Sequence, residues 1–325
     1  MIYALAITGP TASGKTALSI EVAKQLGCEI ISLDSMQIYR GMDIGTAKAT
    51  REEQSAVPHH MIDVISPSEA YSAKAYRDAA LAVAKEISSR GKIPLFVGGT
   101  GLYLSTLMRP ECEEAPRSDP EYELRQRKKL LTGEDRIALW QRLSEVDPES
   151  AENIHYNNVR RVIRALEIFD ATGKTKTYFD SLTKKKNDDI TITHVTLDFH
   201  ERELLYSAVD KRVDIMLSDG LCREVESLLE KGLLPEDSTA AQAIGYKEII
   251  AALKEGRSAD SAADEIKQAS RNYAKRQLTW FRHDSSATHV FIDRECGKRR
   301  PMKEILAEIL SVFRSAQVAQ PNDLT

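Results

Sequence analysis

The chain has 325 residues, of which 42% are apolar and 29% charged, a composition typical of globular proteins and sufficient for a sizeable core. Its formal net charge of −4 excludes a general attraction to nucleic acid, so any such binding requires local basic patches. The cysteines are isolated, without a C-x-x-C pair, which argues against a disulfide framework or a cysteine zinc site. No apolar run approaches the roughly 20 residues that cross a bilayer, and no signal segment precedes the first predicted strand. We therefore expect a soluble, cytoplasmic protein without membrane contact.

The first predicted elements are a strand, a glycine-rich loop and a helix. An apolar run over residues 2–7 predicts a buried strand, and apolar residues at helical spacing predict a helix over 17–26. Between them the pattern G-x-x-x-x-G-K-S/T is fulfilled by Gly9-Pro10-Thr11-Ala12-Ser13-Gly14-Lys15-Thr16. In this context backbone N–H groups can cradle a diphosphate or triphosphate while Lys15 reaches its outer oxygens. Thr16 is then placed to bind Mg²⁺ through its hydroxyl, so we expect Mg²⁺ as the cofactor.

A second strand, predicted over residues 29–33, ends at Asp34. Ligands of parallel sheets gather outside the carboxyl ends of the strands, so Asp34 should emerge at the same edge as the phosphate loop. Its spacing is compatible with three interpretations: a carboxylate that faces the bound phosphate ester, a helix N-cap, or a metal ligand of the Walker B kind. As a general base it would contribute about 10²- to 10⁴-fold in rate.

A third strand is predicted over residues 93–97. Before it, Thr50 and Glu53 indicate a capping box at the start of a short helix, and residues 72–89 an amphipathic helix. The strand ends in Gly98-Gly99-Thr100-Gly101 instead of an acidic residue. The glycines permit close backbone approach to a ligand and Thr100 supplies a hydroxyl, whereas a tight turn without a ligand is the alternative.

From residue 111 to residue 189 strand signals are absent and charged helices predominate, the first of them expected to be capped by Ser118. We therefore predict an α/β protein with a P-loop parallel-sheet core, formed by residues 1–110 and 190–315, and a helical insertion domain over 111–189. Residues 316–325 are expected to be a disordered tail.

Arg160, Arg161 and Arg164 of the insertion form a basic cluster, for which a solvated helix face is as good an explanation as a phosphate contact.

After a strand over 190–197, the chain is predicted to form helices over 202–218, 221–231, 246–254 and about 260–281, a short strand over 288–292 and a helix over 301–313. Arg212 is a candidate cation for a departing diphosphate, although one helical arginine by itself is weak evidence. Residues 267–282 are basic and interleaved with aromatic residues, which suits a nucleic-acid backbone with stacked bases. A basic face over a core stripe is the alternative.

Several motifs together resemble the bacterial tRNA dimethylallyltransferases. In chain order they are residues 9–16, 34–48, 58–60, 97–103, 160–167, 243–248 and 273–282, and they span most of the chain. Members of this family transfer a dimethylallyl group from dimethylallyl diphosphate to the exocyclic N6 amine of the adenosine 3′ of the anticodon, releasing diphosphate. The resemblance implies the tRNA anticodon stem-loop and dimethylallyl diphosphate as partners, and we expect a monomer.

The resemblance also implies roles for individual residues. Asp34 would be the base toward the adenine amine, with Lys15 and Arg212 assisting at the diphosphate, which residues 9–16 would hold. The implied tRNA contacts are Asp34, Ser35, Met36, Gln37, Thr100, Arg117, Arg160, Arg161, Val162, Ile163, Arg164, Gln242, Ala243, Ile244, Gly245, Tyr246, Lys275, Arg276, Gln277 and Arg282. Ala208 stands where relatives usually carry an arginine.

Three other functions share parts of this pattern. An isopentenyltransferase acting on free adenine nucleotide would have the same loop and base, but little use for the basic residues of the insertion and of residues 267–282. A P-loop small-molecule kinase would use the loop for attack at phosphorus and consume ATP. A nucleotide-dependent switch or an RNA-binding module would bind without turnover.

Overall fold

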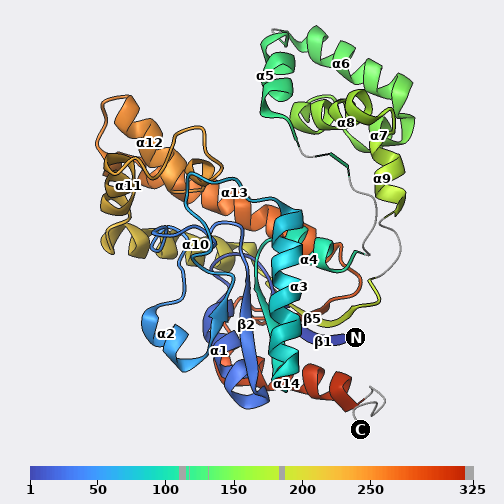
Figure 1. Ribbon diagram of the computed structural model, residues 1–325. Coiled ribbons are helices and arrows are strands. Elements are labelled where there is room, and N and C mark those ends of the chain that lie inside the picture. Colours follow the sequence, from blue (N-terminus) through green and yellow to red (C-terminus); the bar gives the residue numbers. More distant parts are fainter. Residues whose placement is uncertain (110–114, 117, 131, 183–186, 319–325) are drawn as a thin grey trace. The chain divides into compact units, whose positions relative to one another are not determined.

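The computed structural model describes residues 1–109, 115–116, 118–130, 132–182 and 187–318 (Figure 1). These residues form two compact units, one built from Met1–Met108 together with the chain from Asp189 onward, the other from Arg109–Asp188. In the described part of the chain, no helix is both long and apolar enough to cross a membrane.

The first unit is built on a six-stranded sheet with the strand order β3-β2-β4-β1-β5-β6. All pairings are parallel, which confirms the predicted α/β class. Strand β1 lies between β4 and β5 and is buried on both faces, so its sequence is almost uninterruptedly apolar. The strands are β1 (Ile2–Thr8), β2 (Cys28–Leu33), β3 (His59–His60), β4 (Ile93–Gly98), β5 (Ile190–Asp198) and β6 (Thr288–Phe291).

Helices cover both faces of this sheet (Figure 1). Leu5 and Ile7 of β1 belong to a core cluster with α1 (Lys15–Leu26) and α14 (Met302–Val318). Ala4 and Ala6 point to the other face and share a cluster with α3 (Ala73–Ser89), as the alternation of side chains along a strand requires. The other helices described in this unit are α2 (Arg51–Ala56), α4 (Gly101–Leu107), α10 (Arg202–Ser218), α11 (Leu221–Glu230), α12 (Tyr246–Lys254) and α13 (Ala263–Arg282), with 3₁₀ turns at Ala240–Gln242 and Ala259–Ala262.

The second unit is helical. Its helices are α5 (Pro120–Lys128), α6 (Gly133–Val146), α7 (Pro148–Asn153), α8 (Val159–Thr172) and α9 (Lys176–Leu182). The expected cap at Ser118 is wrong: Asp119 is the N-cap of α5, because its carboxylate accepts the N–H of Glu121 while Pro120 occupies the first helical position. The Ser118 hydroxyl instead donates to the buried carboxylate of Glu167, 3.2 Å away.

Helix α14 is longer than the sequence predicted. It continues to Val318, so the first residues of the tail expected from residue 316 are helical. Residues 319–325 lie outside the described part of the chain.

Gly98, at the end of β4, has no room for a side chain. A Cβ added there would lie 2.3 Å from the carbonyl oxygen of Leu33 on the neighbouring strand β2. We expect Gly98→Ala to lower the stability of the protein by at least about 1 to 3 kcal/mol, because a backbone atom cannot move aside as a side-chain end can. The measurement is thermal unfolding, with Gly133→Ala as the matched control, since nothing lies within 4 Å of a Cβ at that position. Equal melting temperatures for Gly98→Ala and the unaltered protein would contradict this packing.

Candidate active site

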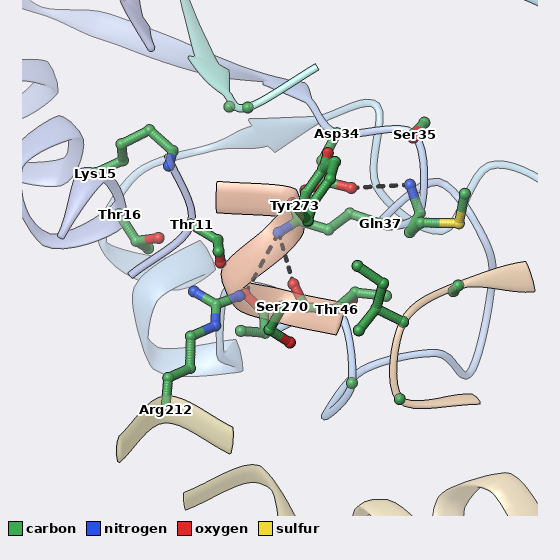
Figure 2. A pocket seen from close by; sticks show the side chains of 18 of the residues that line it. Thr11, Lys15, Thr16, Asp34, Ser35, Gln37, Thr46, Arg212, Ser270 and Tyr273 are labelled. Carbon is green, nitrogen blue, oxygen red and sulfur yellow. Dashed lines mark hydrogen bonds between the residues drawn. The ribbon is translucent and has the colours of Figure 1, made fainter. Parts of the chain in front are cut away.

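A cavity of about 340 Å³ opens at the carboxyl ends of β1, β2 and β4 (Figure 2). The phosphate loop contributes Thr11, Lys15 and Thr16, and the segment after β2 contributes Asp34 to Gln37. Helices α10 and α13 add further side chains, and every lining residue belongs to the first unit. Its lining includes Arg212, Ser270, Tyr273, Arg276 and Gln277 from these helices. The structure therefore brings the predicted phosphate loop, the predicted base and the predicted diphosphate arginine to one cavity.

The phosphate loop has the backbone that its glycines permit. Gly9 has φ 141°, and a Cβ on it would lie 2.7 Å from the carbonyl oxygen of Leu197 on β5, so the loop can cross this strand end only with glycine. Gly14 is the N-cap of α1 in a left-handed conformation and no side chain caps the helix. The first N–H groups of α1 are thus left without a side-chain partner, as in helix N-termini that bind anions.

Lys15 lies in a cationic environment. Its ammonium donates to the carbonyl oxygens of Gly9 at 2.9 Å and Pro10 at 2.7 Å. Burial and the nearby guanidinium of Arg212 lower the pKa of Lys15 to about 7, and the negative charge of Asp34 only partly offsets them. Arg212 makes no hydrogen bond or ion pair with any residue that the structure describes, and Figure 2 shows its guanidinium rising from α10 into the cavity. Two cations with only the single negative charge of Asp34 near them favour a polyanionic ligand.

Asp34 is held by its own loop. Its Oδ1 accepts the N–H of Met36 at 2.8 Å, as a capping aspartate does, although a turn and not a helix follows. The backbone N–H of Ser35, the residue directly after Asp34, donates to the Thr100 hydroxyl at 3.2 Å. Gln37 accepts from the Ser32 hydroxyl at 2.9 Å and donates to the backbone. These bonds leave Asp34 Oδ2 without a partner among the described residues, so one carboxylate oxygen is available to a ligand.

Gly98 and Gly99, at the end of β4, line the cavity, and they are also closely packed, as is Gly101. Gly98 makes room for β2; a Cβ on Gly99 would lie 2.0 Å from the amide nitrogen of Gln277, and one on Gly101 2.0 Å from the indole nitrogen of Trp280. Close packing against β2 and α13 thus requires glycine at these positions, and the approach of a ligand to this backbone stays a prediction. Thr100 acts through its bond to Ser35 and supports the Asp34 loop.

Glu224 of α11 is a supporting residue that reasoning from the sequence did not select. Its carboxylate accepts the N–H groups of Asp43, Ile44 and Gly45 at 2.9, 2.8 and 3.2 Å and the hydroxyl of Tyr246. The bonded loop in turn receives the Gln37 amide at Thr46 and Ala47. Glu224 therefore stabilises the position of the Asp34 segment through two layers of hydrogen bonds.

Tyr273 lines the cavity, and sequence reasoning did not place it there. Burial raises the pKa of its phenol to about 12, and the charge of Asp34 acts in the same direction. The Arg276 guanidinium lies 5.6 Å from the ring centroid of Tyr273. An aromatic ring next to Asp34 offers a surface on which a planar base can stack.

The residues implied to contact tRNA differ widely in exposure. Exposed ones are Arg160, Arg161, Gln242, Lys275, Arg276 and Arg282. Buried ones are Val162, Ile163, Ala243, Gly245, Tyr246 and Gln277. Any contact that the first five make with RNA would therefore be made mainly by their backbone atoms. The side-chain amide of Gln277 is hydrogen-bonded within the protein. Ile244 and Met36 are half-buried and line the cavity. Arg117 lies outside the described residues.

The basic face expected over residues 267–282 is only partly free. Lys267 pairs with Asp214 at 2.6 Å, Arg271 with Asp210 at 2.6 Å and Arg282 with Asp198 at 2.7 Å. In the helical unit, Arg164 pairs with Glu167 at 2.7 Å. The cations of α13 without an ion pair, among the residues that the structure describes, are therefore Lys275 and Arg276.

A phosphate loop between β1 and α1, a parallel sheet, and a carboxylate at the adjacent strand end define a P-loop α/β protein. A family model described as IPP transferase matches residues 37–284. Because this model matches most of the chain, the chain belongs to the IPP transferase family. The matched segment begins three residues after Asp34.

Relatives and solved structures agree with this assignment. A tRNA dimethylallyltransferase of Bacillus cereus (strain AH187) is 47% identical over 285 residues, which cover 87% of each chain. A tRNA delta(2)-isopentenylpyrophosphate transferase from Staphylococcus epidermidis superimposes with a TM-score of 0.68 at 39% identity, covering 97% of this chain and 100% of that one. A eukaryotic dimethylallyltransferase described as acting on tRNA gives a TM-score of 0.71 at 29% identity, covering 90% of this chain and 74% of that one.

The low pKa of Lys15 predicts proton uptake when a diphosphate binds. Above about pH 8 the Lys15 amine of the empty site is mostly neutral, and a bound polyanion raises its pKa toward the ordinary value. Binding of dimethylallyl diphosphate between about pH 8 and 9 should therefore take up close to one proton, and its affinity should fall as the pH rises. Titration calorimetry in two buffers of different ionisation enthalpy measures the uptake. Lys15→Met should abolish it and Lys24→Met, at an exposed site of α1, should not. Equal heats in both buffers for the unaltered protein would refute the prediction.

Proposed function

We propose that this chain transfers a dimethylallyl group from dimethylallyl diphosphate to the exocyclic N6 amine of the adenosine that follows the anticodon in tRNA, releasing diphosphate. The single observation that carries the proposal is that the phosphate loop, Asp34 and Arg212 line one cavity. A site for an anionic leaving group thus faces a carboxylate that can take a proton. The printed names of the relatives, tRNA dimethylallyltransferases, support the same reaction and the same class of acceptor.

The chemistry is an attack at carbon. The N6 nitrogen attacks C1 of the dimethylallyl group, the bond between C1 and the bridging oxygen breaks, and its electron pair leaves with the diphosphate. Asp34 accepts the proton that the nitrogen loses. The loop N–H groups, Lys15 and Arg212 stabilise the negative charge that develops on the departing diphosphate. No atom is oxidised or reduced, so no redox cofactor is needed.

We propose Mg²⁺ as the cofactor at Thr16. The Thr16 hydroxyl lines the cavity and has no hydrogen-bond partner among the described residues. Mg²⁺ typically keeps several waters and takes only one or two protein oxygens beside the phosphates of its substrate, so one hydroxyl fits the requirement. When bound, the ion would neutralise charge on the diphosphate.

The acceptor adenosine must leave its stack to reach Asp34, which costs a few kcal/mol and is cheapest in a single-stranded loop. For this we propose that Lys275, Arg276 and Gln242 contact the anticodon stem-loop at the first unit. Arg160 and Arg161 of the helical unit, Arg109–Asp188, are proposed to contact the same RNA. Tyr273 is available for stacking on the extruded base. We further propose that the protein acts in the cytoplasm, where tRNA is found, and as a monomer.

The experiment that tests this function offers two acceptors. The protein is incubated with dimethylallyl diphosphate and either unmodified tRNA or AMP, and the nucleosides are analysed by mass. We expect the dimethylallyl group on one adenosine of tRNA and little on AMP. Preferred use of AMP would favour the free-nucleotide enzyme, and consumption of ATP without a prenylated product would favour a kinase.

Replacing Asp34 tests its role as the base. Asp34→Asn keeps an oxygen that can accept the Met36 N–H but removes the proton acceptor. We expect kcat to fall about 10²- to 10⁴-fold while the dissociation constant for tRNA changes little. Single-turnover transfer and filter binding measure the two quantities. Asp78→Asn, at an exposed position of α3, should leave both unchanged. A collapse of tRNA affinity with the same loss would assign Asp34 to binding instead.

Replacing Arg276 tests the RNA contact. Because Arg276 is exposed and has no ion pair within the described chain, its guanidinium is free to meet a phosphate. We expect Arg276→Ala to weaken tRNA binding and to reduce the slope of log K against log salt by about 0.7 to 0.9. The control is Arg202→Ala, at an exposed position of α10. An unaltered slope would mean that Arg276 does not contact the phosphates of tRNA and has a role only within the protein.

A further inference from the structure

Gln277 occupies a junction between three segments that are distant in the sequence. Its side chain, on α13, is 6% exposed. Its Oε1 accepts the N–H of Thr11 in the phosphate loop at 2.8 Å, and its Nε2 donates to the carbonyl oxygen of Gly99 after β4 at 2.9 Å. A backbone N–H can only donate and a backbone carbonyl can only accept, so both bonds fix the same orientation of the amide.

The surrounding backbone leaves room for this amide. A Cβ on Gly99 would lie 2.0 Å from Gln277 Nε2 and 3.4 Å from the carbonyl oxygen of Gly9. Glycine at position 99 therefore lets the glutamine lie between the phosphate loop and the end of β4. A shorter side chain at position 277 would reach one of the two partners at most.

The segment that follows α13 also lies close to a residue that contacts the start of the phosphate loop. Asp284, just after the helix, lies 3.2 Å from Nδ1 of His194 on β5. The other ring nitrogen of His194 bonds the hydroxyl of Thr8 at 2.7 Å, and Thr8 directly precedes Gly9. The residue after α13 thus approaches a histidine that bonds Thr8, just before the loop, while Gln277 bonds the loop itself at Thr11.

Gln277 also lies on a different face of α13 from its basic neighbours. It shares the buried face with Ala274, Leu278 and Phe281, at the i−3, i+1 and i+4 positions. Lys275 and Arg276 are exposed. One short segment therefore presents cations outward and a neutral hydrogen-bonding group inward, toward the phosphate loop.

We infer that Gln277 is a positioning residue for the diphosphate and not a tRNA contact. Acting through Thr11 and Gly99, it holds the phosphate loop in the conformation that directs its N–H groups into the cavity. Without it, the loop has to be ordered by the ligand itself, which weakens diphosphate binding. This inference rests on the proposed function, because it concerns the binding of the diphosphate substrate of that same reaction.

The test compares Gln277 with two neighbours on α13. Gln277→Leu removes both bonds, while Gln277→Glu keeps the shape and the acceptor for Thr11 but cannot donate to Gly99 and adds a negative charge near the diphosphate. Both should raise the dissociation constant and KM for dimethylallyl diphosphate by about 5- to 30-fold, with the tRNA dissociation constant unchanged. Arg276→Ala should show the reverse pattern. Gln268→Leu, at an exposed glutamine of the same helix, should change neither.

The ligand constants are measured by calorimetry, with thermal unfolding as the check on folding. If Gln277→Leu does not fold, Gln277→Met, which is neutral, of similar length and also lacks the amide, carries the test, because the added charge of Gln277→Glu would weaken diphosphate binding by itself. Unaltered diphosphate affinity together with weakened tRNA binding would overturn the inference and make Gln277 an RNA contact. Failure of the unaltered protein to bind dimethylallyl diphosphate would overturn the proposed function as well, so the two failures can be told apart.

Discussion

The site depends on the excess of positive charge at the end of β1, which favours a bound anion. The loop N–H groups and the uncapped start of α1 present partial positive charge, and Lys15 and Arg212 add full charges beside them. Burial and the charge of Arg212 lower the pKa of Lys15, and the negative charge of Asp34 offsets them only in part. The diphosphate of the proposed substrate would meet these N–H groups and both cations together, which is why we assign this end of the site to the leaving group.

The acceptor side of the site is maintained by hydrogen bonds between segments far apart in the sequence. Thr100 holds the backbone next to Asp34, and Gln37 ties the same segment to the loop at Thr46 and Ala47. Glu224 fixes that loop from α11. Loops without a regular hydrogen-bonding ladder need such partners to hold a side chain in one place, and a carboxylate that removes a proton needs that precision.

Much of the fold could be predicted because local patterns dictate it. The apolar strands, the capping box of α2 and the phosphate-loop motif each depend on residues close in sequence. The support of the site could not be predicted in this way. The bonds of Glu224 to Gly45 and of Gln277 to Thr11 join residues 179 and 266 positions apart, and the ion pairs that neutralise Lys267 and Arg271 come from another helix. A resemblance can mark Gln277 as functional, but only the fold indicates what it touches.

The central claim is that the phosphate loop retains an intact diphosphate while the bond to carbon breaks. The most direct measurement follows the oxygen that bridges C1 and phosphorus, isotopically labelled in dimethylallyl diphosphate, during one turnover with unmodified tRNA. This account predicts that all of the label leaves in the diphosphate and none enters the RNA or dimethylallyl alcohol. Label found in the alcohol, with phosphate transferred elsewhere, would mean attack at phosphorus and would contradict it.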